Sequence, residues 1–150
     1  MTKPTLNIRA YEPRDNAALT KIWHEASSIA HGFLSAEKLL EHRQLVAEVY
    51  LPQAETWVAC LDGKPVGFLG LMDNFIGGLF VSPDAQGIGV GQALVRHGQS
   101  LKGTLHLDVY AQNERTVGFY QKMGFKETKR SPVDKEGLPF EEISMTLWPV

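Results

Sequence analysis

Cysteine is nearly absent from this sequence: Cys60 is the one example in 150 residues. A single cysteine excludes an intrachain disulfide and a cysteine-rich metal site. Cys60 lies in an apolar stretch typical of a strand, so we expect a buried thiol that packs as a small hydrophobic side chain. The five histidines and the scattered acidic residues show no spacing typical of metal ligands, and we expect no metal.

Long apolar runs and a strong net charge are also missing. No stretch approaches the roughly 20 apolar residues of a membrane-spanning helix, and the N-terminus lacks the apolar core and cleavage site of a secretory signal. A net charge of −2 and a pI near 6.2 argue against a general binder of nucleic acid or of anionic membranes. We therefore expect a cytoplasmic protein without nucleic acid or membrane among its partners.

The residue pattern predicts an α+β protein with one mixed, mostly antiparallel sheet flanked by helices. The length and the lack of linkers or repeats indicate one domain, residues 1–150. The expected order is β-α-α-β-β-β-α-β-α-β-β, and Pro52 is expected to stop the second helix. The expected strands cover residues 6–11, 56–61, 66–72, 75–81, 105–109, 125–130 and 141–147.

The most informative stretch runs from Leu79 to Leu94. An apolar strand ends at Ser82-Pro83-Asp84, and Gly87, Gly89 and Gly91 follow just before a helical pattern. Glycines let the backbone turn sharply and bring its N–H groups against a ligand. The first amides of a helix lack intrahelical partners and suit a phosphate. A tight turn without a ligand is the alternative.

Two well-known phosphate loops do not fit this stretch. A P-loop needs Gly-Lys-Ser/Thr, which is absent, and a dinucleotide fingerprint needs G-x-G-x-x-G spacing. Instead, Gln86-x-x-Gly89-x-Gly91 after a strand that ends in Ser-Pro resembles motif A of the GNAT superfamily, the acetyl-CoA-dependent N-acetyltransferases. A second segment, with Asn113, Tyr120 and Gly124-Phe125 after another strand, is similar to the family's next motif. In size and layout the chain resembles small bacterial members.

The resemblance implies a GNAT-like fold in which the fourth and fifth strands splay apart and acetyl-CoA lies in the gap. It implies that the pyrophosphate meets the glycine loop, that the strand backbone pairs with the pantetheine arm, and that Asn113 hydrogen-bonds this arm. Asn113 alternatively caps the following helix. The implied cofactor-binding residues are Leu79, Phe80, Val81, Gln86, Gly87, Ile88, Gly89, Val90, Gly91, Gln92, Asn113 and Tyr120.

Tyr120 is the predicted catalytic residue. A phenol near the departing sulfur donates a proton and stabilises negative charge. The alternative is a core tyrosine on an amphipathic helix. Many GNAT enzymes carry a Glu early in the fourth strand as a base, but this region reads Phe75-Ile76-Gly77-Gly78. A water relayed to a backbone carbonyl or to a distant side chain remains open for that role. The glycine pair allows close approach of the acetyl group or marks a β-bulge.

The acceptor side is defined less well by the sequence. His31 and Phe33, between the first two helices, are the predicted substrate residues, and His106 is a further candidate. Trp23, Tyr110 and Phe140 line an acceptor pocket or belong to the core. We expect direct acetyl transfer from acetyl-CoA to a primary amine in a ternary complex. A non-catalytic acyl-CoA-binding module is the alternative. The sequence does not identify the amine, and a monomer and a homodimer paired through a final-strand edge both remain open.

Overall fold

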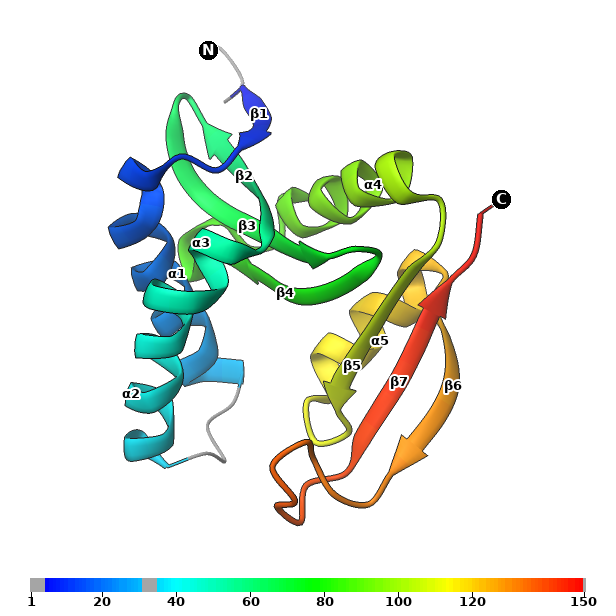
Figure 1. Cartoon of the computed structure of the whole chain (residues 1–150). Coiled ribbons are helices and arrows are strands. Elements are labelled where there is room, and N and C mark those ends of the chain that lie inside the picture. Colours follow the sequence, from blue (N-terminus) through cyan, green and yellow to red (C-terminus); the bar gives the residue numbers. More distant parts are fainter. Residues whose placement is uncertain (1–4, 31–34, 150) are drawn as a thin grey trace.

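The computed structural model describes residues 5–30 and 35–149, and its strands form one seven-stranded sheet in the order β1-β2-β3-β4-β5-β7-β6 (Figure 1). Every neighbouring pair is antiparallel except β4 and β5. The expected α+β architecture is thus confirmed. The strands are β1 (Leu6–Ala10), β2 (Glu55–Leu61), β3 (Lys64–Met72), β4 (Phe75–Val81), β5 (Leu105–Tyr110), β6 (Lys126–Ser131) and β7 (Glu142–Leu147).

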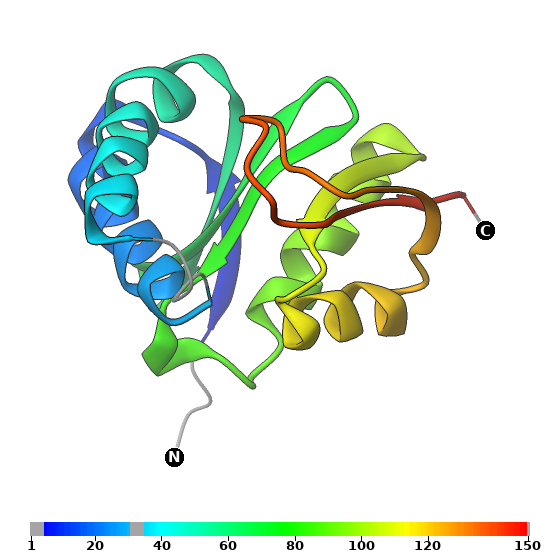
Figure 2. The ribbon, with the colours of Figure 1, turned by 90° about the horizontal axis from the view of Figure 1, so that it is seen from below.

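Helices cover both faces of the sheet (Figures 1 and 2). On one face, α1 (Asn16–Ala30), after the short 3-10 helix η1 (Pro13–Asp15), and α2 (Ala36–Leu45) bury an apolar cluster that includes Leu19, Trp23 and Cys60. On the other face, α4 (Val90–Lys102) and α5 (Glu114–Met123) cover a cluster that includes Leu94 and Tyr120. Cys60 is 2% exposed, which confirms the expected buried thiol. Within the described residues, no helix has the length and apolarity needed to cross a membrane.

The prediction that Pro52 stops the second helix is wrong. The chain continues from α2 through a π-helical turn, η2 (Val46–Tyr50), and one further turn, α3 (Leu51–Gln53), so Pro52 lies inside helical structure. A proline ring clashes with the carbonyl of the preceding helical turn in an ordinary α-helix. The wider π-turn just before Pro52 relieves this clash and lets the helix run into β2.

The sheet divides between β4 and β5. These parallel strands pair only at Phe75 and His106, where the His106 amide donates to the Asn74 carbonyl at 3.0 Å. Beyond this point β4 remains paired with β3 alone, and a register shift at Gly70/Leu71 places a bulge at Gly77 of β4. The strands therefore diverge toward their carboxyl ends, as the family resemblance implied.

The last strand in the chain does not lie at an edge of the sheet. β7 is inserted between β5 and β6, and β6 forms the edge, so the expected final-strand edge for a dimer is wrong. β7 buries Ile143, Met145 and Leu147, whereas β6 consists of exposed polar residues except for a half-buried Ser131. The more apolar strand takes the inner position because it loses more water-exposed apolar surface there.

Candidate functional site

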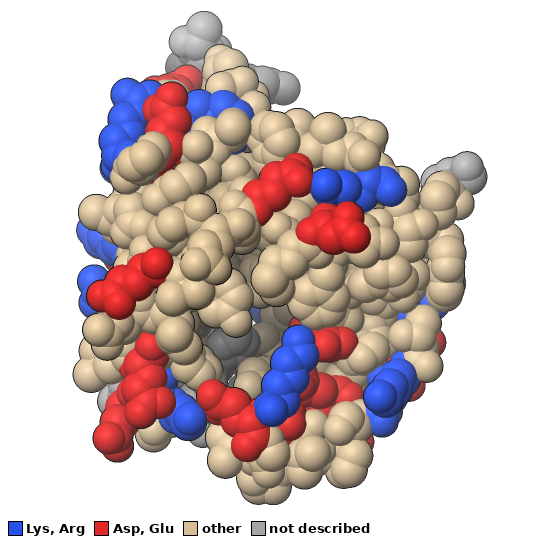
Figure 3. Space-filling view, viewed as in Figure 1, with Lys and Arg blue, Asp and Glu red and all other residues tan. Residues whose placement is uncertain are grey.

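A cleft of about 1060 Å³ opens where β4 and β5 diverge. Figure 3 shows a hollow on this face of the molecule, with acidic side chains gathered along its lower rim. The residues lining the cleft come from β4 and β5, from the loop before α4, from the start of α5, and from α2, η2 and the β6–β7 loop. The cleft thus joins the two motifs of the sequence to parts of the chain that neither motif contains.

The glycine loop forms one end of the cleft. Gly87 and Gly89 have φ values of +84° and +90°, which L side chains rarely adopt, and a Cβ at either position would meet nothing within 4 Å. The first hydrogen bond of α4 joins the Ala93 amide to the Gly89 carbonyl at 3.0 Å. The amides of residues 89–92 precede this bond, so they have no partner within the helix and are suited to bind an anion. Gln86 Nε2 donates to the Val81 carbonyl at 3.2 Å and holds the loop against β4.

β4 presents an open backbone edge to the cleft. On its other edge Leu79, Phe80 and Val81 are in register with Leu69, Phe68 and Gly67 of β3. β5 has diverged at this level, so the edge of β4 that faces it offers backbone N–H and C=O groups to an extended ligand. The Gly77 bulge lies at the start of this edge, where the absence of a side chain permits close approach.

Asn113 occupies the N-cap position of α5, but its side chain makes no capping hydrogen bond. It is 9% exposed and lines the cleft. Of the two interpretations that the sequence left open, a side-chain cap is therefore wrong. The amide group is placed to contact whatever fills the cleft.

Tyr120 lies on α5 with its ring packed edge-on against Phe119 and Phe125, both at 5.2 Å between centroids. The residue is 6% exposed and lines the cleft. Burial raises the pKa of the Tyr120 phenol above its usual value. Like an ordinary tyrosine, the phenol is protonated at neutral pH, so it has a proton to donate to a group in the cleft.

The opposite end of the cleft carries carboxylates. On the polar face of β5 and β7, Asp108 is in register with Ser144 and Tyr110 with Glu142. Ser144 Oγ donates to Asp108 Oδ1 at 2.7 Å, and the Tyr110 hydroxyl donates to Asp134 Oδ2 at 3.1 Å. Asp108, Asp134, Glu136 and Glu142 all line the cleft, and Lys135 stands among them.

Glu142 lies where its surroundings change the pKa of its carboxyl. Burial, and to a smaller degree the negative charges of Asp108 and Asp134, raise its pKa, while the positive charge of Lys135 acts in the other direction. A carboxylate with a raised pKa in a cleft is a candidate general base, because its basicity lies closer to neutral pH.

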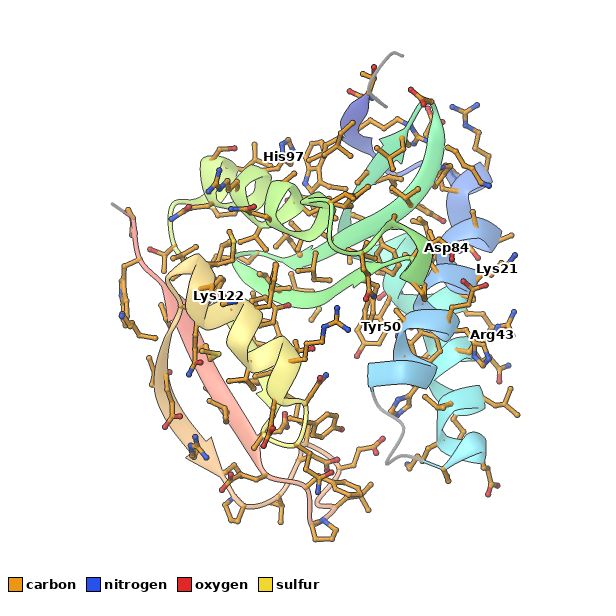
Figure 4. The ribbon with its side chains drawn as sticks, turned by 180° about the vertical axis from the view of Figure 1, so that it is seen from behind. Lys21, Arg43, Tyr50, Asp84, His97 and Lys122 are labelled. Carbon is orange, nitrogen blue, oxygen red and sulfur yellow. The ribbon has the colours of Figure 1, made fainter. Side chains whose placement is uncertain are left out.

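The helices of the first half close the acceptor end of the cleft. The lining residues here include Trp23, His42 and Tyr50. Figure 4 shows Tyr50 between the helices α1 and α2 and the strands. Glu136, in the β6–β7 loop, pairs with Lys38 at 3.1 Å and lies 3.7 Å from His42. The Lys38–Glu136 ion pair therefore connects α2 to the β6–β7 loop across this end of the cleft.

The structure brings together every predicted cofactor-binding residue except Ile88, whose side chain is 60% exposed and does not line the cleft. Among the substrate candidates, Trp23 and Tyr110 line the cleft, while His31 and Phe33 lie outside the described residues. His106 instead hydrogen-bonds Thr146 Oγ1 at 2.8 Å, and Phe140 packs against the Tyr110 ring at 6.2 Å.

The carboxylates were not predicted from the sequence, and neither was Arg115, which lines the cleft near the start of α5. The one available signal was the alternation in β5, where His106, Asp108 and Tyr110 share the polar face. No local sequence pattern shows that Asp108 and Glu142 are neighbours, because only the β5–β7 register brings them to the same part of the sheet. Over residues 5–30 and 35–149, no three His, Cys, Asp or Glu side chains converge as metal ligands would.

Comparisons with known proteins agree with this geometry. A family model described as an acetyltransferase (GNAT) domain matches residues 52–127. The chain is 40% identical over 141 residues to the peptidyl-lysine N-acetyltransferase YjaB of Escherichia coli, covering 93% of this chain and 95% of that protein. It is 33% identical to the peptidyl-lysine N-acetyltransferase YiaC of the same organism, covering 95% and 97% of the two chains.

Solved structures show the same fold. The solution structure of apo-form YjaB from Escherichia coli aligns with a TM-score of 0.88 and 39% identity over 97% of this chain and 99% of that one. The PaiA N-acetyltransferase of Thermoplasma acidophilum, solved in complex with coenzyme A, aligns with a TM-score of 0.76 and 18% identity over 93% and 98%. Because the identity to PaiA is only 18%, this similarity concerns the fold alone.

Proposed function

Because the chain belongs to the GNAT family of acetyltransferases and transfers an acetyl group from acetyl-CoA to an amine, we propose that its acceptor is the side-chain amine of a lysine in a peptide or protein. One observation carries this proposal: four carboxylates from β5, β7 and the β6–β7 loop line the cleft beside a single lysine of that loop, Lys135. Carboxylates attract and orient an ammonium group. The names of YjaB and YiaC, both peptidyl-lysine N-acetyltransferases, support the same acceptor.

The glycine-loop end of the cleft fits the donor, acetyl-CoA. The amides of Gly89 to Gln92, at the positive end of the α4 dipole, would hold the pyrophosphate. Arg115, at the start of α5, also lines the cleft and adds a positive charge there. The open edge of β4 would pair with the amide groups of the pantetheine arm, and Asn113 would hydrogen-bond this arm from the opposite wall. In this pose the acetyl group reaches the Gly77 bulge, between the donor and acceptor ends.

Two side chains would move the protons of the transfer. Glu142 would accept a proton from the acceptor ammonium, since its raised pKa makes it a better base than an ordinary glutamate. The neutral amine then attacks the thioester carbonyl, and Tyr120 would protonate the departing sulfur. Positioning both substrates in one cleft supplies much of the remaining rate.

The position of the single thiol supports direct transfer in a ternary complex, without an acyl-enzyme. Cys60 is 2% exposed and packs in the cluster beneath α1 and α2 rather than lining the cleft. Formation of an acyl-cysteine needs an accessible thiolate. We also propose that the reaction takes place in the cytoplasm.

The test is acetylation of three matched peptides, followed by CoA release and by mass spectrometry of the products. The first has a blocked N-terminus and one lysine, the second has arginine in place of that lysine, and the third has a free N-terminus and no lysine. We expect turnover with the first peptide alone, with the acetyl group on the lysine Nζ. Turnover with the third peptide, or binding of acetyl-CoA without turnover of any amine, contradicts the proposal. The second outcome favours the non-catalytic binding module instead.

A further inference from the structure

Lys135 of the β6–β7 loop brings an amine of the chain itself into the cleft. Its Nζ lies 3.1 Å from Asp108 Oδ2 and 4.7 Å from the centroid of the Phe75 ring. An ammonium group is attracted both by the carboxylate and by the face of the ring. Lys135 thus occupies the acceptor end, where an incoming lysine side chain is expected to bind.

The residues on either side of Lys135 fix its backbone. Asp134 Oδ1 accepts hydrogen bonds from the amides of Glu136 and Leu138, both at 2.9 Å, and Asp134 Oδ2 accepts one from Tyr110. Glu136 is tied to Lys38 of α2 at 3.1 Å. The loop backbone is therefore held at the cleft on both sides, while the Lys135 side chain is 66% exposed and has room to move.

The proposed position of the acetyl group lies within reach of this side chain. Phe75, over which Nζ lies, is the first residue of β4, and the Gly77 bulge follows two residues later. Two residues of a strand span about 7 Å. Rotation of the four-carbon lysine stem covers such a distance without movement of the loop backbone.

We propose that Lys135 is an acetyl acceptor within its own chain, so that the enzyme acetylates itself at this position. The inference rests on the proposed function. Glu142 or Asp108 takes one proton from the Lys135 ammonium, and the Nζ lone pair forms a bond to the thioester carbonyl carbon. The carbon–sulfur bond breaks, Nζ loses its second proton, and Tyr120 protonates the sulfur, which leaves as CoA thiol while Tyr120 regains a proton from solvent. The products are Nζ-acetyl-Lys135, CoA and one proton released to solvent.

Acetylation changes the charge of the acceptor end. The amide product carries no positive charge, so its ion pair with Asp108 and its attraction to the Phe75 ring are both lost. Asp108 is then available to an external ammonium group. The modified enzyme is therefore expected to bind a lysine peptide with a lower KM than the unmodified enzyme.

The experiment follows the site and rate of acetylation after acetyl-CoA is added to the purified chain, by intact mass and peptide mapping. Lys21 is the matched comparison: it is 75% exposed, pairs with Glu25 at 3.9 Å and lies on α1 away from the cleft (Figure 4). We expect Lys135 to gain one acetyl group at least about tenfold faster than Lys21, because tethering raises its effective concentration at the thioester. The rate for Lys135 is expected not to depend on protein concentration.

Variants separate this proposal from its alternatives. Lys135→Arg keeps the positive charge and is expected to abolish the fast acetylation, while Lys21→Arg leaves it unchanged. Tyr120→Phe is expected to slow acetylation of Lys135 but not of Lys21, which reacts without catalysis. Equal rates at Lys135 and Lys21, or a Lys135 rate proportional to protein concentration, overturn the proposal. If lysine peptides are acetylated while Lys135 is not, self-acetylation is refuted and the proposed function stands; if neither is acetylated, both fail.

Discussion

We assign protonation of the leaving sulfur to the Tyr120 hydroxyl. Tyr120→Phe removes this hydroxyl and keeps the ring between Phe119 and Phe125. We expect kcat to fall by about 10²-fold, the usual contribution of one general acid. The affinity for acetyl-CoA is expected to change little. Steady-state kinetics with a lysine peptide, combined with calorimetric titration of acetyl-CoA, measures the two effects separately.

A structural role for Tyr120 gives a different result. If the tyrosine were only a core residue, the phenylalanine variant would keep kcat and alter the free energy of unfolding alone. Unchanged kcat in a folded variant therefore contradicts the catalytic assignment.

The raised pKa of Glu142 leads to a prediction about how activity depends on pH. Its raised pKa means that the carboxylate loses its proton only as the pH rises above the range of an ordinary glutamate. Activity of the wild type is therefore expected to increase with pH through the pKa of Glu142. Glu142→Gln should reduce kcat by about 10²-fold and remove this acid limb from the pH profile of kcat.

Glu141 supplies the matched control for this substitution. It is the preceding residue, and its side chain pairs with Arg130 at 2.9 Å rather than lining the cleft. Glu141→Gln should leave both kcat and the acid limb intact. An acid limb that persists in Glu142→Gln would assign the base to another group, such as Asp108.

At the residue scale, the residues predicted to surround acetyl-CoA do line the cleft, whereas the carboxylates that also line it were not predicted. Gly89, Asn113 and Tyr120 stand at fixed spacings within two short segments, and each segment folds as one strand–loop–helix unit. The acceptor carboxylates have no such spacing. Asp108 and Glu142 come from strands 34 positions apart in the sequence and meet through the β5–β7 register, which no local pattern specifies.

Among the elements, the loop before α4 carries the most direct prediction. Gly89→Ala forces a Cβ onto a residue with φ +90°, and Gly63→Ala does the same at φ +83° in the β2–β3 hairpin. A Cβ at either position meets nothing within 4 Å, so both variants should lose about 1–2 kcal/mol of stability for the same reason. Only Gly89→Ala is expected to weaken acetyl-CoA binding, as measured by calorimetry. Equal acetyl-CoA affinities in the two variants would show that the loop does not hold the cofactor.

The junction of β1 and α1 depends on one ion pair. Arg9 donates two hydrogen bonds of 2.8 Å to Asp15, which is 3% exposed, and this pairing lowers the pKa of Asp15. Asp15→Asn should cost about 2 kcal/mol in urea unfolding at neutral pH. A lowered folded-state pKa stabilises the protein above pH 3.8, the unfolded value, and this stabilisation disappears as the pH falls through the folded pKa.

Asp84 provides the comparison for that measurement. It is exposed at the beginning of the glycine loop (Figure 4), and Asp84→Asn should change the free energy of unfolding by less than about 0.5 kcal/mol. The difference in free energy of unfolding between wild type and Asp15→Asn should shrink as the pH falls. If this difference stays constant through the acid range, the role given to the ion pair is contradicted.

The sequence predicted most elements, because their signals are local. α5 ends before Gly124, which has φ +106°, and a glycine in this left-handed conformation is a common local signal for the end of a helix. The Asp62-Gly63 hairpin has positive φ at both residues, as its turn type requires. The course of the chain through Pro52 and the insertion of β7 were missed, since both depend on how neighbouring segments pack.

For the whole molecule, the divided sheet places two opposite environments at the ends of one cleft. In the proposed function, the helix amides of the glycine loop would hold the phosphates of acetyl-CoA, while the carboxylates of β5, β7 and the β6–β7 loop would attract the acceptor ammonium. A separate apolar cluster supports each face of the sheet. In the proposed function, this arrangement would direct the two substrates to opposite ends of the cleft, so that they would meet beside Gly77 and Tyr120.

The most direct test of this arrangement is the change in backbone amide NMR shifts when acetyl-CoA is added to the chain. The account predicts that the largest changes occur at Leu79–Val81, at residues 87–92 and at Asn113, with small changes in β6 and at the Gly63 turn. Large shifts confined to other parts of the chain, or no shifts at saturating acetyl-CoA, would contradict the claim that the cleft between β4 and β5 holds the acetyl donor.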